Sequence, residues 1–146
     1  MAIEIRILRP QDLAVLDRVA PDVFDHPINR ERTAEFLNDP RHHLAVAVDE
    51  GVVVGFVSAV HYVHPDKPSP ELWINEVSVA ESHRRQGLAT KLLDEIFDLA
   101  RQLGCTEAWV LTDRENKAAM RLYEGAGAAT APAESVMFTF FLNERI

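Results

Sequence analysis

The chain has 146 residues, 47% of them hydrophobic, and a formal net charge of −8 at pH 7. This length suits one well-buried domain, so we expect a single domain over residues 1–146. The negative charge argues against nucleic acid or anionic lipid as a partner and favours a cationic one. No apolar run approaches the roughly 18 residues of a membrane span, and the first ten residues lack a signal peptide's apolar core, so we expect a cytoplasmic protein.

Period-two alternation and turn residues predict the elements of the first half. A strand over residues 3–8 stops at Pro10 and precedes a helix over about 11–19, and residues 29–38 suit a polar helix with Asn29 as its N-cap. The next elements in chain order are a hairpin of apolar strands over 43–48 and 52–63, a proline-rich loop over 64–70, and a strand over 71–79.

The clearest helix signal in the second half covers residues 87–103, where leucines recur at helical spacing until Gly104 ends the pattern. A strand over 107–112, a short helix within 116–127 and a final strand over 134–142 follow. This order predicts a mixed α/β sheet with helices on both faces.

Cysteine and histidine give no sign of a metal centre. Cys105, the only cysteine, cannot form an internal disulfide and suits a small core position. His42 and His43 are adjacent in a strand and point to opposite faces, and no carboxylate stands at metal-binding spacing from His61 or His64. We therefore expect no metal, and either of the latter two histidines could instead contact a substrate.

A basic, glycine-containing turn stands at the start of the long helix, in the sequence HRRQGLATKLL from residue 83. A helix N-terminus exposes free N–H groups, and Gly87 would let an anion approach the backbone closely. Arg84, Arg85 and the Thr90 hydroxyl add charge and a donor, and His83 would cap or line the turn. The turn therefore predicts a phosphate site, although it also suits an ordinary solvated surface turn. The P-loop and GxGxxG patterns are absent, which disfavours nucleoside triphosphate and dinucleotide enzymes.

Two motifs carry a family resemblance. RRQGLA, residues 84–89, fits the pattern [QR]-x-x-G-x-[GA], and NKAAMRLYEGAGA, residues 116–128, fits N-x-x-A-x-x-L-Y-x-x-x-G. The chain thereby resembles the GCN5-related N-acetyltransferase superfamily. The resemblance implies a mostly antiparallel sheet of about six to seven strands with about four helices, and acetyl-coenzyme A (acetyl-CoA) as cofactor. Relatives are often homodimers.

A narrower resemblance is carried by residues 55–93 and by the Val-Met pair in the last predicted strand. These segments are most similar to the small aminoglycoside 3-N-acetyltransferases. They imply acetyl transfer to a primary amine, the 3-amino group of an aminoglycoside, with a small polycationic substrate as partner. Other acceptors stay open, namely a protein N-terminus, a lysine or a small amine metabolite. So does a non-catalytic module that only binds acyl-coenzyme A.

The superfamily resemblance also assigns roles to cofactor-binding residues. It implies that the main chain of Val77, Ser78 and Val79 pairs with the pantetheine arm like an added strand. Asn116 would contact the pantetheine amides, and it also suits a helix N-cap. The residues that would hold the pyrophosphate are Arg84, Arg85, Gln86, Gly87, Leu88, Ala89 and Thr90.

Acetyl transfer to an amine needs a neutral nitrogen, and deprotonating an alkyl amine at neutral pH costs roughly 4 kcal/mol. Glu76, within the strand WINEVSV, is the candidate general base. Tyr123 matches the family tyrosine near the sulfur and can protonate the leaving thiolate. Each has an ordinary alternative, a polar strand position for Glu76 and a core aromatic for Tyr123.

Carboxylates are needed to hold the ammonium groups of a polycationic acceptor. Asp113 at the end of the fifth predicted strand, Glu134 ahead of the last one, and Asp25 between the first helices are the candidates. Judged alone, each also suits a plain surface acid.

Overall fold

The structure is a computed structural model that describes residues 2–130 and 135–143. It divides into two compact units, Met1–Asp113 and Arg114–Ile146. The expected single domain over residues 1–146 stays a prediction.

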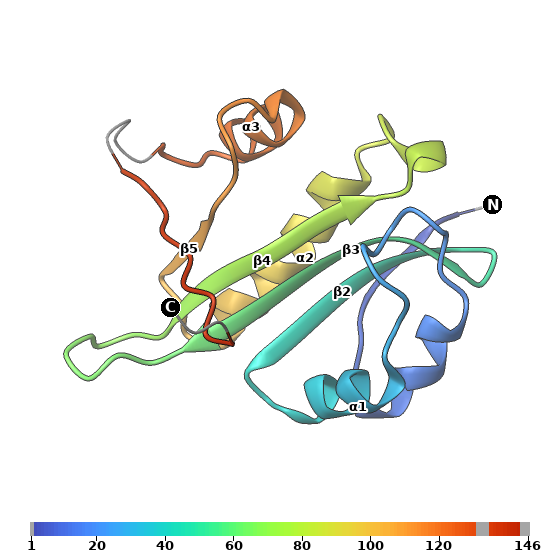
Figure 1. Ribbon diagram of the computed structural model, residues 1–146, viewed down its shortest axis with the longest axis horizontal. Coiled ribbons are helices and arrows are strands. Elements are labelled where there is room, and N and C mark those ends of the chain that lie inside the picture. Colours follow the sequence, from blue (N-terminus) through green and yellow to red (C-terminus); the bar gives the residue numbers. More distant parts are fainter. Residues whose placement is uncertain (1, 131–134, 144–146) are drawn as a thin grey trace. The chain divides into compact units, whose positions relative to one another are not determined.

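The first unit is built on a five-stranded sheet in the order β1-β2-β3-β4-β5 (Figure 1). The first four strands are antiparallel, and β5 runs parallel to β4. Its elements are β1 (Glu4–Ile7), the 3-10 helix η1 (Pro10–Asp17), α1 (Arg30–Asn38), β2 (His42–Asp49), β3 (Val52–Tyr62), β4 (Glu71–Val79), the 3-10 helix η2 (Glu81–His83), α2 (Leu88–Gln102) and β5 (Glu107–Val110).

Helices cover both faces of this sheet, as the order of the elements predicted. The apolar side of α2 packs on the face that carries Gly55, where an added Cβ would lie 3.4 Å from Leu92 Cδ1. The opposite face carries Phe56, whose ring stacks on Phe24 from the loop after η1 at 4.1 Å between centroids. We call these the α2 face and the η1 face. The mixed α/β class is confirmed.

Individual elements follow the predictions closely in place but not always in type. Asn29 caps α1, its Oδ1 accepting the N–H of Arg32 at 2.9 Å. The helix predicted over 11–19 is the 3-10 helix η1, entered through a reciprocal cap in which the Arg9 N–H donates to Asp12. Cys105 is buried, as expected for a core position.

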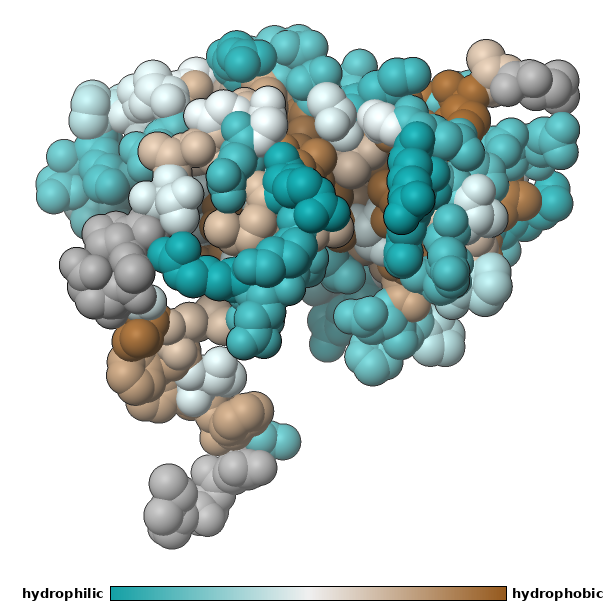
Figure 2. Space-filling model, turned by 90° about the horizontal axis from the view of Figure 1, so that it is seen from above, coloured by the Kyte–Doolittle hydropathy of each residue, from teal (hydrophilic) through white to brown (hydrophobic). Residues whose placement is uncertain are grey.

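The second unit contains α3 (Lys117–Gly125), capped by Asn116, whose Oδ1 accepts the N–H of Ala119 at 3.1 Å. The strand predicted over 134–142 is wrong for residues 135–142, which adopt no helix or strand. A strand needs a hydrogen-bonded neighbour, and none is recorded for this segment in the described ranges. Over the described residues, the sheet of the first unit therefore has five strands instead of the six or seven expected. In Figure 2 the segment lies between grey stretches and is mainly tan and brown, because its large apolar side chains are exposed.

Candidate active site

A β-bulge in β4 decides where Glu76 points. Ser58 pairs with Glu76 while the next residue, Ala59, pairs with Ile74, so Asn75 is an extra residue in β4. Ile74 is buried on the α2 face. Without the extra residue, strict alternation would place Glu76 on that same face. The bulge instead turns Glu76 to the η1 face, opposite Ser58.

The same position marks the end of pairing between β4 and β5. The parallel ladder runs from Glu71 opposite Glu107 to Ile74 opposite Val110. Beyond it, residues 75–79 have β3 on one side and no strand on the other, within the part of the chain that the structure describes. The backbone groups there that face away from β3, apart from the Val79 carbonyl bonded by Arg84, form an open edge to which an extended, amide-containing molecule can hydrogen-bond. This splaying is what the predicted role of Val77, Ser78 and Val79 requires.

The turn after β4 has the backbone of an anion site. Arg85 and Gly87 both adopt the left-handed conformation, with φ of +65° and +74°. Gly87 is the N-cap residue of α2 and has no side chain to cap the helix. No acidic residue stands in the first helical turn. A Cβ at Gly87 would meet nothing within 4 Å, so the space before the helix is open. The free N–H groups of Leu88, Ala89 and Thr90 are therefore available to an anion.

His83 anchors this turn to the β2–β3 hairpin. Its Nε2 lies 2.7 Å from Asp49 Oδ2, and its Nδ1 lies 2.7 Å from Ser82 Oγ. A carboxylate only accepts hydrogen bonds, so Nε2 carries the hydrogen of the contact with Asp49. His83 was expected to cap or line the turn, and the structure gives it this anchoring role. Nothing in the sequence singled out its partner, because Asp49 is 34 residues away.

Asp22 makes a second anchor, which sequence reasoning also missed. Its Oδ2 accepts the N–H of Glu81 at 2.7 Å. Next to it, the hydroxyl of Ser78 donates to the carbonyl oxygen of Val23 at 2.7 Å. The loop over residues 20–28 is thus fastened both to β4 and to the turn that follows it. The Arg84 side chain also bonds within the turn, because its Nε donates to the Val79 carbonyl at 3.2 Å.

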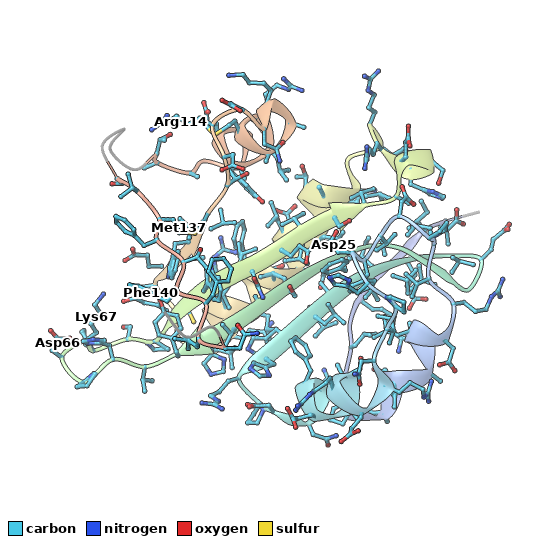
Figure 3. All side chains as sticks on the ribbon, in the orientation of Figure 1. Asp25, Asp66, Lys67, Arg114, Met137 and Phe140 are labelled. Atoms are coloured by element: carbon cyan, nitrogen blue, oxygen red, sulfur yellow. The ribbon has the colours of Figure 1, made fainter. Side chains whose placement is uncertain are left out.

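Glu76 and Asp25 form the acidic part of the site. Partial burial, and secondarily the negative charge of Asp25, raise the pKa of the Glu76 carboxyl. A higher pKa makes its carboxylate a better proton acceptor. Figure 3 shows Asp25 on the loop that crosses the η1 face. That loop also lines a surface hollow with Phe24 and His26, and Glu76 is not part of the lining.

The structure gives less support to the other predicted site residues. Asp113 is exposed and lies beyond the end of β5, not at it, because the strand stops at Val110. Glu134 lies outside the described residues. Tyr123 is half-buried on α3, and burial raises the pKa of its phenol, so the hydroxyl keeps its proton at neutral pH. Since α3 belongs to the second unit, the roles of Tyr123 and Asn116 stay predictions.

The histidines do not gather near Glu76. His61 and His43 form a hydrogen-bonded pair, 2.7 Å from His61 Nδ1 to His43 Nε2. His61 pairs in register with the fully buried Leu72, which places it on the α2 face, away from Glu76. His64 contacts Asp66 in the exposed loop between β3 and β4. Among the described residues no three histidine, cysteine or acidic side chains are placed to hold a metal, and no helix is long and apolar enough to cross a membrane.

Residues 11–128 match the acetyltransferase (GNAT) family. The match covers most of the chain, including the open edge of β4, the turn before α2 that we call the anion turn (residues 84–87), and α3. The chain belongs to the acetyltransferase (GNAT) family. The expected enzyme class, an acetyl-CoA-dependent N-acetyltransferase, and the expected cofactor are therefore confirmed at the level of the family.

Two curated relatives differ in their names and lengths. The GNAT chain is 32% identical over 114 residues to aminoglycoside N(6')-acetyltransferase type 1 of Serratia marcescens, covering 75% of this chain and 77% of the relative. It is 34% identical over 82 residues to rat N-acetyltransferase family 8 member 2, covering 56% of this chain and only 36% of the relative. The Serratia enzyme is named for the 6′ position, whereas the sequence resemblance predicted a 3-N enzyme.

Solved structures support the GNAT fold. An aminoglycoside acetyltransferase from an uncultured soil metagenomic sample, crystallised with sisomicin, superposes with a TM-score of 0.79 and covers 97% of both chains. The two sequences are 22% identical, so the likeness concerns the fold alone. The fold class expected from the sequence is thus confirmed.

Proposed function

We propose that this protein transfers an acetyl group from acetyl-CoA to a primary amine of an aminoglycoside. The observation that carries the proposal is the open edge of β4 over residues 75–79. It stands between a carboxylate suited to take a proton and a turn suited to hold a diphosphate. Acetyl-CoA supplies an activated thioester when it is bound there.

The chain offers donors for two parts of this cofactor. Backbone groups of Val77, Ser78 and Val79 would pair with the amides of the pantetheine arm. The main chain of Gly87 and the first turn of α2 would hold the pyrophosphate, since residues 85 and 87 are left-handed and the first turn of α2 has no acidic side chain. Arg85 is exposed and adds a positive charge to the same turn.

Glu76 would act as the general base. An alkylammonium with a pKa near 10 is almost fully protonated at neutral pH, and a carboxylate whose own pKa is raised can accept its proton as the nitrogen attacks. Asp25 contributes twice, because its charge raises the pKa of Glu76 and attracts the cation. Tyr123 would donate its phenolic proton to the departing sulfur.

The acceptor class is supported by charge and by relatives. The net charge of −8 favours a polycation, and Asp25 and Glu76 share the η1 face. Asp113 and Glu134 remain candidate contacts for further ammonium groups. The 3-amino group follows from the sequence resemblance, while the name of the Serratia relative favours the 6′-amino group. NMR of the acetylated product decides between these two nitrogens.

Release of coenzyme A measured with a thiol reagent tests the proposal. Acetyl-CoA would be offered with a panel of acceptors that comprises sisomicin, a peptide with a free N-terminus, lysine and a small monoamine. We expect turnover to be fastest with sisomicin. Equal or faster turnover of the peptide or lysine would mean that the acceptor is a protein N-terminus or a lysine and not an aminoglycoside. Cofactor binding without turnover of any amine would mean a non-catalytic module.

A further inference from the structure

A row of aromatic side chains crosses the η1 face beside Glu76. Trp73 of β4 stands in register with Trp109 of β5, and the two indoles stack at 5.6 Å between centroids and 21° between planes. On its other side Trp73 pairs with Val60 of β3. These are the only two tryptophans in the chain.

A hydrogen-bond chain fixes the orientation of this pair. Trp109 Nε1 donates to the Tyr62 hydroxyl at 2.6 Å, and that hydroxyl donates to Glu71 Oε1 at 3.2 Å. Glu71 in turn binds Lys67 Nζ at 2.5 Å, so its charge is already balanced by the lysine. Lys67 lies on the loop between β3 and β4, as Figure 3 shows. We call Tyr62, Trp73 and Trp109 the indole platform.

Trp109 is held on several sides but remains partly exposed. Trp109 keeps 38% of its surface exposed, although a strand partner, a stacked ring and a hydrogen bond all hold it. Large aromatic side chains are usually buried more completely when they serve only the core. An oriented, accessible indole face beside a reactive carboxylate therefore suits a ligand.

The platform continues the proposed acceptor site. Trp73 and Glu76 lie on the same face of one strand, three positions apart with the bulge between them. At the rise of a strand, their Cα atoms are roughly 7–10 Å apart. A molecule whose amine reaches Glu76 therefore extends over the indoles if it is longer than one ring.

We propose that the indole platform binds a second ring of the acceptor, the one that is not acetylated, while the reacting amine lies at Glu76. This inference rests on the proposed function and adds a specificity site to it. A sugar ring presents an apolar C–H face to an indole, and its ammonium groups are attracted to the π-face. The Glu71 carboxylate is already paired with Lys67, and the rings offer an apolar face to that part of the acceptor.

Steady-state kinetics with two acceptors tests the inference. We expect Trp109→Ala to lower the ratio of kcat/KM for sisomicin to kcat/KM for one-ring glucosamine by roughly 5- to 30-fold, mainly through KM. Trp109→Phe should restore most of the ratio, because it keeps an aromatic face. Leu103→Ala is the matched control, since Leu103 is 37% exposed and stands at the C-cap of α2. A ratio unchanged in Trp109→Ala would overturn the inference, as would an equal loss for both acceptors.

A binding measurement separates this inference from the proposed function. Both tryptophans belong to the platform, so the intrinsic fluorescence of the cofactor-free protein reports on it directly. Titration with sisomicin should change this fluorescence saturably, and Trp109→Ala should weaken the binding. That result would stand even if no amine were acetylated, which would refute only the proposed function. Acetylation of sisomicin without any fluorescence change would refute only the platform.

Discussion

The two halves of β4 differ in nearly every physical respect. Residues 71–74 are paired on both sides, and Leu72 and Ile74 are almost completely buried there. Residues 75–79 are paired on one side only, and Asn75 and the partly buried Glu76 keep much of their surface exposed. One inserted residue separates a half that stabilises the fold from a half whose backbone and carboxylate are free to bind ligands. Substitutions in the two halves should therefore affect different properties of the protein.

The largest expected effect is the loss of the base. Glu76→Gln should lower kcat/KM by roughly 100-fold or more, since an amide cannot accept the proton. Because the pKa of Glu76 is raised, activity of the unmodified protein should fall on acidification at a higher pH than an ordinary carboxyl would give, and the variant should lack this limb. Glu95→Gln, on the exposed side of α2, should behave as the unmodified protein. If Glu76→Gln kept the pH profile of the unmodified protein, another group would have to be the base.

The anion turn should be nearly as sensitive. Gly87→Glu introduces a negative charge into the open space ahead of α2 and should weaken acetyl-CoA binding by at least about 100-fold in calorimetry. Gly87→Ala provides the comparison, because it adds only the strain of a side chain at φ +74° without charge. Equal affinities of Gly87→Glu and the unmodified protein would place the cofactor elsewhere.

The packed half of β4 should instead control stability. Leu72 is fully buried, so Leu72→Ala should reduce the free energy of unfolding by about 2–5 kcal/mol, measured in urea. Asn75→Ala, in the exposed bulge, should change it by less than about 0.5 kcal/mol. A larger effect at Asn75 than at Leu72 would contradict the division of the strand.

The smallest effect concerns the anchor of the turn. Asp49→Asn keeps the shape of the side chain but weakens its hydrogen bond with His83, so the turn should be held less firmly. We expect KM for acetyl-CoA to rise roughly 3- to 10-fold with little change in kcat. The exposed Asp98→Asn on α2 serves as control, and a fall in kcat at constant KM would mean that His83 acts in the chemistry instead.

Local patterns predicted most of the fold. The leucine spacing of α2 and the Asn29 cap of α1 each depend on neighbouring residues. The prediction of the final strand is wrong because a strand must pair with a distant segment of the chain. The apolar composition of residues 135–142 does not specify that segment. Glu76 was identified by its place in the strand WINEVSV, but the direction of its side chain depends on the register of β3 against β4. Asp49 and Trp109 act through partners 34 and 47 residues away, which no single stretch of sequence indicates.

The central claim is that the free edge of β4 binds the cofactor beside Glu76, and hydrogen exchange tests it most directly. Amide exchange would be followed by mass spectrometry with and without coenzyme A. The account predicts new protection in peptides covering residues 75–90, with no change in residues 71–74 or in β5, whose ladder is already formed. Protection confined to other segments, or none over 75–90, would contradict it.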